Sequence, residues 1–118
     1  MRVLIVEDEP IIAMEIEAIV LQSRPSAEIV TAMSVREALL AVEGALDLAF
    51  LDIDVTDGKT YEIALALQTR KVPFTFVSGA SMADAPPCLK GSSLVPKPFS
   101  PLEILRSIEA AEADRHGA

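Results

Sequence analysis

The sequence has few of the residues on which several protein classes depend. Cys88 is the only cysteine among 118 residues, so an internal disulfide and a cysteine-based zinc site are both excluded. Lysine and arginine together number 10 against 18 aspartates and glutamates, tryptophan is absent, and there is one tyrosine. Because nucleic-acid binding depends on positive charge and on aromatic stacking, we expect no direct contact with DNA or RNA.

Long apolar runs are missing as well. The first apolar stretch, Val3-Leu4-Ile5-Val6, is followed at once by acidic residues, which makes it too short for a signal peptide or a membrane span. With 51% hydrophobic and 24% charged residues, the chain has the balance of a globular protein. We therefore expect one domain over 1–118 with no output domain, in the cytoplasm and without membrane contact.

Two apolar patterns alternate along the chain. Short runs rich in β-branched or aromatic residues predict strands, and apolar residues at helical spacing predict helices between them. The predicted strands cover residues 3–6, 28–32, 48–51, 74–77 and 94–96. The predicted helices run from Pro10 to about Ser23, from Ser34 to about Glu43-Gly44, from Tyr61 to near Arg70-Lys71, and from Pro101 onward.

The stretch from Ala80 to Ser93 differs from the other connections. It contains Pro86, Pro87 and Gly91 and has no sustained apolar period, so we expect a short turn of helix there or none. Strands that alternate with helices predict an α/β fold, in which helices cover both faces of a parallel sheet. The carboxyl ends of all strands then lie along one edge, where ligands of such folds bind.

Polar residues follow four of the predicted strands at that edge. They are Glu7 and Asp8, Asp52 and Asp54, Ser78, and Lys97. Carboxylates gathered in one crevice repel each other unless a cation joins them, and their oxygen atoms suit Mg²⁺. A lysine ammonium and a serine hydroxyl provide the charge and the hydrogen bond that a phosphoryl group requires. We interpret Asp52 as a carboxylate nucleophile that takes a phosphoryl group. Taken alone, each residue also has a structural explanation, such as a helix cap for Asp8 or a turn for Ser78.

These residues resemble the response-regulator receiver domain of two-component signalling over almost the whole chain. Val6-Glu7-Asp8-Glu9-Pro10 is similar to the acidic pair after the family's first strand, and Leu51-Asp52 is similar to its phospho-acceptor. Ser78 is similar to its conserved hydroxyl, and Lys97-Pro98 to its Lys-Pro pair. The resemblance implies a flavodoxin-like, three-layer fold with a five-stranded parallel sheet of order 2-1-3-4-5.

The same resemblance implies a reaction and a set of ligands. Asp52 would accept a phosphoryl group from the phosphohistidine of a sensor histidine kinase or a phosphotransfer protein. The chain would then act on an unnamed downstream protein as a switch, or serve as a phosphorelay intermediate, and its origin would be bacterial. Asp8, Asp52 and the backbone carbonyl of Asp54 would hold Mg²⁺, with Glu7 acting through water. Ser78 and Lys97 would bind the phosphoryl oxygens.

The sequence departs from the common receiver pattern at several places, of which two affect the signalling surface. Leu94 stands three residues before Lys97, where the family usually has an aromatic switch residue. Phe74-Thr75-Phe76-Val77-Ser78-Gly79 resembles a receiver subgroup with a Phe-x-Phe-Ala-Thr-Gly motif and a reduced fourth helix. We therefore expect a signalling surface unlike the common one, and a monomer or a weak homodimer.

Two alternative functions remain open from the sequence. A pseudo-receiver would keep the fold as a pure interaction module, without phosphorylation. Asp52-Ile53-Asp54 also resembles the Asp-x-Asp motif of haloacid-dehalogenase-type phosphatases, although that motif normally lies on the first strand of a larger chain. We expect no enzymatic activity beyond aspartyl phosphate formation and loss at Asp52.

Overall fold

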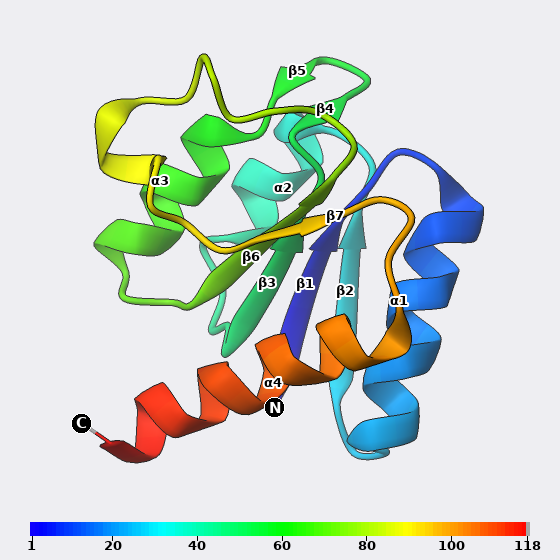
Figure 1. Ribbon diagram of the computed structural model, residues 1–118. Coiled ribbons are helices and arrows are strands. Elements are labelled where there is room, and N and C mark those ends of the chain that lie inside the picture. Colours follow the sequence, from blue (N-terminus) through cyan, green and yellow to red (C-terminus); the bar gives the residue numbers. More distant parts are fainter. Residues whose placement is uncertain (118) are drawn as a thin grey trace.

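The sheet has the strand order that the resemblance implies. The computed structural model describes the backbone of residues 1–117 and the side chains of residues 1–114, so Ala118, the last residue of the predicted domain, lies outside it. The strands of the sheet are β1 (Arg2–Val6), β2 (Glu28–Ala32), β3 (Leu48–Leu51), β6 (Phe74–Ser78) and β7 (Leu94–Pro96). They form a parallel, five-stranded sheet of order β2-β1-β3-β6-β7 (Figure 1). The predicted order 2-1-3-4-5 counts the same strands and is confirmed.

Helices cover both faces of this sheet. They are α1 (Pro10–Ser23), α2 (Val35–Ala41), α3 (Tyr61–Thr69) and α4 (Pro101–Gly117), with a short 3-10 helix, η1 (Pro87–Leu89). One face packs against α1 and α4, and the other against α2, α3 and η1 (Figure 1). The result is the flavodoxin-like, three-layer architecture. No helix in the described part of the chain combines the length and the apolar character needed to cross a membrane.

Alternating side chains divide the core into two parts. In β1, Val3 and Ile5 pack with α1 and α4, whereas Leu4 and Val6 pack with the helices of the opposite face. All four side chains are 0% exposed. Because both faces are covered, the strand is apolar at successive positions rather than at every second one.

The second helix begins as predicted but ends early. The hydroxyl of Ser34 accepts a hydrogen bond from the backbone N–H of Glu37 at 3.1 Å, which caps the first turn. The helix ends at Ala41 rather than near Glu43-Gly44. The N–H groups of Glu43 and Gly44 bond to carbonyls three residues back, at 3.4 and 3.2 Å. Such tightened bonds take up the carbonyl groups that the end of a helix leaves free.

The connection between β6 and β7 contains little helix. Within the described residues, the stretch 79–93 forms only η1, whose Leu89 N–H donates to Pro86 O at 2.9 Å. The side chain of Leu89 is 0% exposed and fills part of the core beside α3. The prediction of a short fourth helix is therefore confirmed, and β7 follows as the outer strand of the sheet.

A small hairpin lies beyond the end of β3. It consists of β4 (Asp54–Val55) and β5 (Gly58–Lys59), paired antiparallel. Gly58 has a φ of 140°, a backbone conformation that residues other than glycine rarely adopt. Figure 1 shows the hairpin at the same edge of the sheet as the carboxyl end of β3.

Candidate functional site

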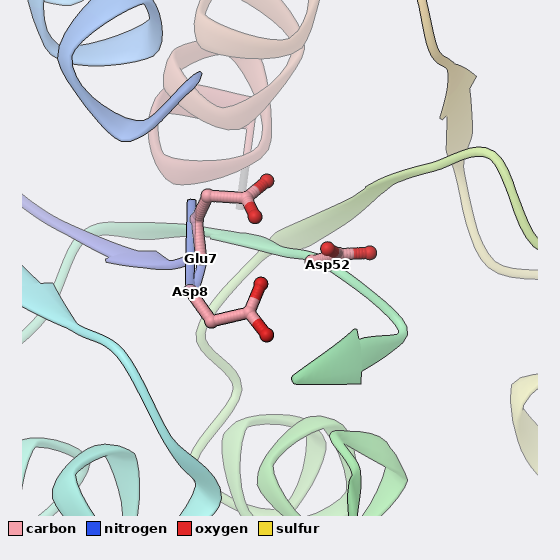
Figure 2. Close-up of side chains that lie close together, drawn as sticks. All are labelled: Glu7, Asp8 and Asp52. Carbon is pink, nitrogen blue, oxygen red and sulfur yellow. The ribbon is translucent and has the colours of Figure 1, made fainter. Parts of the chain in front are cut away.

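The register of the central strands sets three carboxylates side by side. Val6 in β1 is paired with Leu51 in β3, and the N–H of Asp52 donates to Val6 O at 2.9 Å. The residues that follow these two strands therefore leave the sheet at the same level. Glu7, Asp8 and Asp52 gather there (Figure 2), and one oxygen of each lies within 4.8 Å of the others.

The carboxylate of Asp52 accepts a hydrogen bond on each oxygen. Ser78 Oγ donates to Oδ1 at 2.8 Å, and Lys97 Nζ donates to Oδ2 at 3.1 Å. Ser78 ends β6 and Lys97 follows β7, and the N–H of Lys97 donates to Ser78 O at 3.2 Å. The structure thus brings the predicted acceptor, hydroxyl and lysine into direct contact. Asp52 is largely buried, with 9% of its surface exposed.

Glu7 is deeply buried, at 2% exposure. Its Oε1 accepts from Lys97 Nζ at 2.6 Å, and its Oε2 accepts from the N–H of Glu9 at 3.1 Å. Burial raises the pKa of Glu7 to about 7, although the hydrogen bond from Lys97 acts in the opposite direction. This carboxyl group therefore changes its charge near neutral pH.

Lys97 connects Glu7 with Asp52 and remains charged. Burial by itself lowers the pKa of Lys97, but the hydrogen bonds to Glu7 and then to Asp52 outweigh it, and the pKa is raised overall. The peptide bond between Lys97 and Pro98 is cis. Among the described residues, the ammonium of Lys97 is the cation that contacts the acidic cluster.

The remaining predicted residues are less closely involved. Asp8 is half-buried, and the hydroxyl of Thr56 lies 3.5 Å from its Oδ2. The carboxylate of Asp54 pairs with Lys59 Nζ at 2.7 Å and is 54% exposed, and it is outside the group of three carboxylates. Leu94 is 39% exposed on β7.

The donor set fits a hard divalent cation. Glu7, Asp8 and Asp52 offer only oxygen atoms, and these are the ligands that Mg²⁺ prefers. Three carboxylates face one ammonium, so the cluster carries an excess of negative charge when all three are ionised. The site and the fold are therefore compatible with Mg²⁺.

Several solved structures share this fold over nearly the whole chain. A CheY-like response regulator receiver domain protein from Methanospirillum hungatei JF-1 matches with a TM-score of 0.84, at 23% identity over 99% of this chain and 98% of that one. The receiver domain of the response regulator PhyR from Erythrobacter litoralis matches with a TM-score of 0.79, at 28% identity over 94% and 88%. SdrG from Sphingomonas melonis Fr1 matches with a TM-score of 0.79, at 32% identity over 95% and 96%. The chain belongs to the response-regulator receiver family.

Structure reveals this membership where other comparisons do not. No protein-family model matches the chain, and no curated protein matches it in sequence. The fold, together with the polar residues at the strand ends, therefore carries the assignment to the receiver family.

Thr60 supports the backbone of Asp52 and was missed by the sequence analysis. Its side chain is 0% exposed, and its hydroxyl donates to the backbone carbonyl of Asp52. The N–H of Thr60 also donates to Ile53 O at 2.9 Å. A threonine directly before a helix normally indicates an N-cap, but Thr60 makes no side-chain capping bond to α3. The position of Thr60 before α3 therefore suggests a helix cap, whereas its hydroxyl bonds to Asp52 instead.

Asp57 connects two parts of the fold through its side chain. Its Oδ1 accepts from the N–H of Val35 at 2.6 Å, and its Oδ2 accepts from the N–H of Arg36 at 3.1 Å. These hydrogen bonds, that of Val35 first, hold the pKa of Asp57 below its usual value. Asp57 thereby attaches the β4–β5 hairpin to the first turn of α2.

Proposed function

We propose that this receiver accepts a phosphoryl group on Asp52 from the phosphohistidine of a sensor histidine kinase or a phosphotransfer protein. The observation that carries the proposal is the pair of hydrogen bonds on the Asp52 carboxylate, from Ser78 and from Lys97. In the transfer, a carboxylate oxygen of Asp52 bonds to phosphorus while the bond from phosphorus to the histidine nitrogen breaks. The electron pair of the broken bond stays on that nitrogen.

Ser78 and Lys97 would exchange one partner for another during this transfer. Both now contact the oxygens of Asp52, and the phosphoryl oxygens would take that place. An ammonium next to a phosphoryl group offsets its negative charge, and a hydroxyl fixes its orientation. The raised pKa of Lys97 supports this role, because the group keeps its proton at neutral pH.

We assign the Mg²⁺ ligands to Asp8, Asp52 and the backbone carbonyl of Asp54, with Glu7 acting through water. The all-oxygen cluster of Glu7, Asp8 and Asp52 supports this assignment. Bound Mg²⁺ would supply positive charge next to the phosphoryl oxygens. The protein's own part is to hold the carboxylates in place through the paired strands β1 and β3.

The phosphodonor would dock over the first turns of α1. Ile11 and Met14 are 73% and 65% exposed there, and Met33, which follows β2, is 44% exposed. A hollow of about 190 Å³ lies among Met14, Met33 and the acidic Glu7. Exposed apolar side chains grouped next to a reactive site favour contact with another protein.

We further place the chain in the receiver subgroup with a Phe-x-Phe-Ala-Thr-Gly-like fourth strand. The sequence of 74–79 and the reduction of the fourth helix to η1 support this placement. A receiver of this kind would present a different face to its downstream partner, as a monomer or a weak homodimer. Its place in signalling would be that of a switch or of a phosphorelay intermediate.

Intact mass tests the phosphoryl acceptor. Wild type, Asp52→Asn and the matched control Asp54→Asn would be incubated with Mg²⁺ and acetyl phosphate, and with phosphoramidate as a second donor. We expect a gain of one phosphate in wild type and in Asp54→Asn, because Asp54 pairs with Lys59 outside the cluster. We expect no gain in Asp52→Asn, and none without Mg²⁺. An equal gain in Asp52→Asn would assign the acceptor to another residue.

The alternative is a phosphorylation-independent interaction module. The observation that favours it is Leu94, which gives this receiver no aromatic side chain at the usual switch position. No gain in mass from either donor, with Mg²⁺ present, would support this alternative. The structural neighbours are receiver domains, which supports a signalling domain rather than an Asp-x-Asp phosphatase.

A further inference from the structure

One series of contacts leads from Asp52 through β6 into the segment 80–86. Ser78 Oγ donates to Asp52 Oδ1 at 2.8 Å and accepts from the N–H of Ala80 at 3.2 Å. The same hydroxyl thus contacts the acceptor and fixes the start of the segment. In Figure 1 the segment, drawn in yellow-green, rises from the end of β6 and passes over the start of α3. It carries Asp84, which is exposed.

A second series leads from Asp52 to the same Asp84. The hydroxyl of Thr60 donates to the backbone carbonyl of Asp52. Tyr61 follows Thr60 directly, and its phenol donates to Asp84 Oδ1 at 2.9 Å. The two series therefore form a closed ring of contacts that starts at the side chain of Asp52 and returns to its backbone.

The ring of Tyr61 is fixed by packing, so its hydroxyl is a rigid support for the segment. Tyr61 is 9% exposed and lies edge-on to Phe76, with the ring centres 6.1 Å apart. Phe76 lies edge-on to Phe74 in turn, at 5.7 Å. Lys59 Nζ lies 3.8 Å from Asp84 Oδ2 and adds a weaker attraction. Burial, together with the neighbouring carboxylate of Asp84, raises the pKa of Tyr61, so the phenol keeps its proton at neutral pH.

The segment itself has the properties of a locally mobile unit. Ser81, Ala83 and Asp84 are exposed, Ala85 is the one buried residue within 80–86, and Ala80 and Met82 are partly buried against the core. A stretch with few buried side chains opens at low cost in free energy. Its position therefore depends on contacts such as the one between Tyr61 and Asp84.

We propose that the hydrogen bond from Tyr61 to Asp84 is a latch, which holds the segment 80–86 in place and opens when Asp52 is phosphorylated. The latch rests on the proposed phosphorylation. When Ser78 Oγ leaves Asp52 Oδ1 for a phosphoryl oxygen, its bond from the Ala80 N–H is disturbed, and the segment shifts at its start. Asp84 is then drawn away from the fixed phenol. Such a two-state element would report phosphorylation without an aromatic residue at position 94.

Hydrogen exchange of the peptide 79–86 tests the first half of the latch. Tyr61→Phe keeps the ring packed on Phe76 and removes only the hydroxyl. We expect roughly tenfold faster exchange in the unphosphorylated variant, the effect of losing one hydrogen bond to a charged acceptor. Asp84→Ala, on an exposed side chain, should give the same increase. Ser81→Ala is the matched control, because Ser81 Oγ accepts from the Ala83 N–H at 3.3 Å within the segment. We expect only a local change from it.

The second half is tested on wild type with Mg²⁺ and acetyl phosphate, with intact mass recorded on the same samples. Phosphorylated wild type should reach the exchange rate of unphosphorylated Tyr61→Phe, and phosphorylation of the variant should add little. Tyr61 is the only tyrosine and tryptophan is absent, so tyrosine emission gives an independent readout. Emission should rise on phosphorylation, because a phenol that donates to a carboxylate is quenched.

Three results would overturn the latch, and they differ from one another. If Tyr61→Phe exchanges like wild type, the hydrogen bond does not restrain the segment. If wild type gains a phosphate while exchange and emission stay constant, the bond restrains the segment but does not report phosphorylation. If no phosphate is gained, the proposed phosphorylation itself fails, and the latch as a switch fails with it.

Discussion

The two faces of the sheet are covered by very different structures. On one face, α1 and α4 span 14 and 17 residues. On the other, α2 and α3 span 7 and 9 residues, and η1 spans 3. Figure 1 shows the long helices and the short ones on opposite sides of the strands.

The short helices depend more on contacts with the rest of the molecule than the long helices do. Helices shorter than about 12 residues are marginal by themselves, so they depend on contacts with the rest of the molecule. On the short-helix face, polar side chains supply some of these contacts, namely Asp57 at α2, Thr60 before α3, and Tyr61 with Asp84. All of them lie near the carboxyl ends of the strands. The face with the shorter helices is therefore the one on which polar contacts add to the apolar packing.

Shortening a core side chain to alanine should give the largest difference in unfolding free energy between the two faces. Ile104 in α4 and Leu89 in η1 are both 0% exposed. Ile104→Ala should cost about 4 kcal/mol of unfolding free energy, because a long packed helix cannot close the cavity. Leu89→Ala should cost about 2 kcal/mol, because a single turn can move inward. Urea unfolding measures both, and the half-exposed Leu102→Ala serves as the control. Equal losses at 89 and 104 would contradict the comparison.

Removal of the Thr60 hydroxyl should give the next largest loss of unfolding free energy. Thr60→Val leaves the buried carbonyl of Asp52 without its side-chain donor, which should cost about 2 kcal/mol in urea unfolding. Thr69→Val is the matched control, because the Thr69 hydroxyl donates to Leu65 O at 3.0 Å on an exposed part of α3. We expect a loss below about 0.5 kcal/mol there. A similar loss in both variants would remove the special role of Thr60.

Glu7 should give the stability a dependence on pH. Its pKa is raised by burial to about 7, so between roughly pH 4.5 and 7 the folded state binds a proton that the unfolded state has lost. Wild-type stability should therefore fall as pH rises through this window, by at most about 1.4 kcal/mol per pH unit. Glu7→Gln should lack this slope in denaturant titrations at several pH values. A wild type that becomes more stable across the window would reverse the expected sign.

Replacement of Asp57 should give the smallest change in the pH dependence of stability, and this change should be seen only at acidic pH. Because its pKa is lowered in the folded state, Asp57 contributes stability above its usual pKa, and this contribution disappears as pH falls through the lowered value. Asp57→Asn should lose less stability than wild type below about pH 4. The measurement is the thermal midpoint over that range. If the thermal midpoints of wild type and Asp57→Asn fall identically with decreasing pH, α2 does not depend on the hairpin.

The sequence predicted the fold and the proximity of Asp52, Ser78 and Lys97 for a clear physical reason. The central strands β1, β3 and β6 are buried apolar runs that end at or just before polar residues, and parallel strands bring those residues to one edge. The proximity of Asp52, Ser78 and Lys97 follows from this rule alone. The buried ion pair between Glu7 and Lys97 does not, since the length and direction of two side chains decide it.

Contacts between loops could not be predicted in the same way. Asp57 bonds to Val35 and Tyr61 to Asp84 across 22 and 23 residues of sequence. Neither pair belongs to a periodic pattern, and aspartate in a loop most often indicates a turn. The β4–β5 hairpin was missed for a related reason, because strands of two residues are too short to show an alternation.

The edge of the sheet at β7 affects the tendency of this protein to aggregate. A strand with a free edge is a template on which another chain can add a strand and begin aggregation. β7 occupies that edge but has only three residues, and it ends at Pro96, which has no N–H to offer. An added strand would find too few partners for a stable ladder. The β7 edge therefore offers little to an added strand, although the helix that precedes it is short.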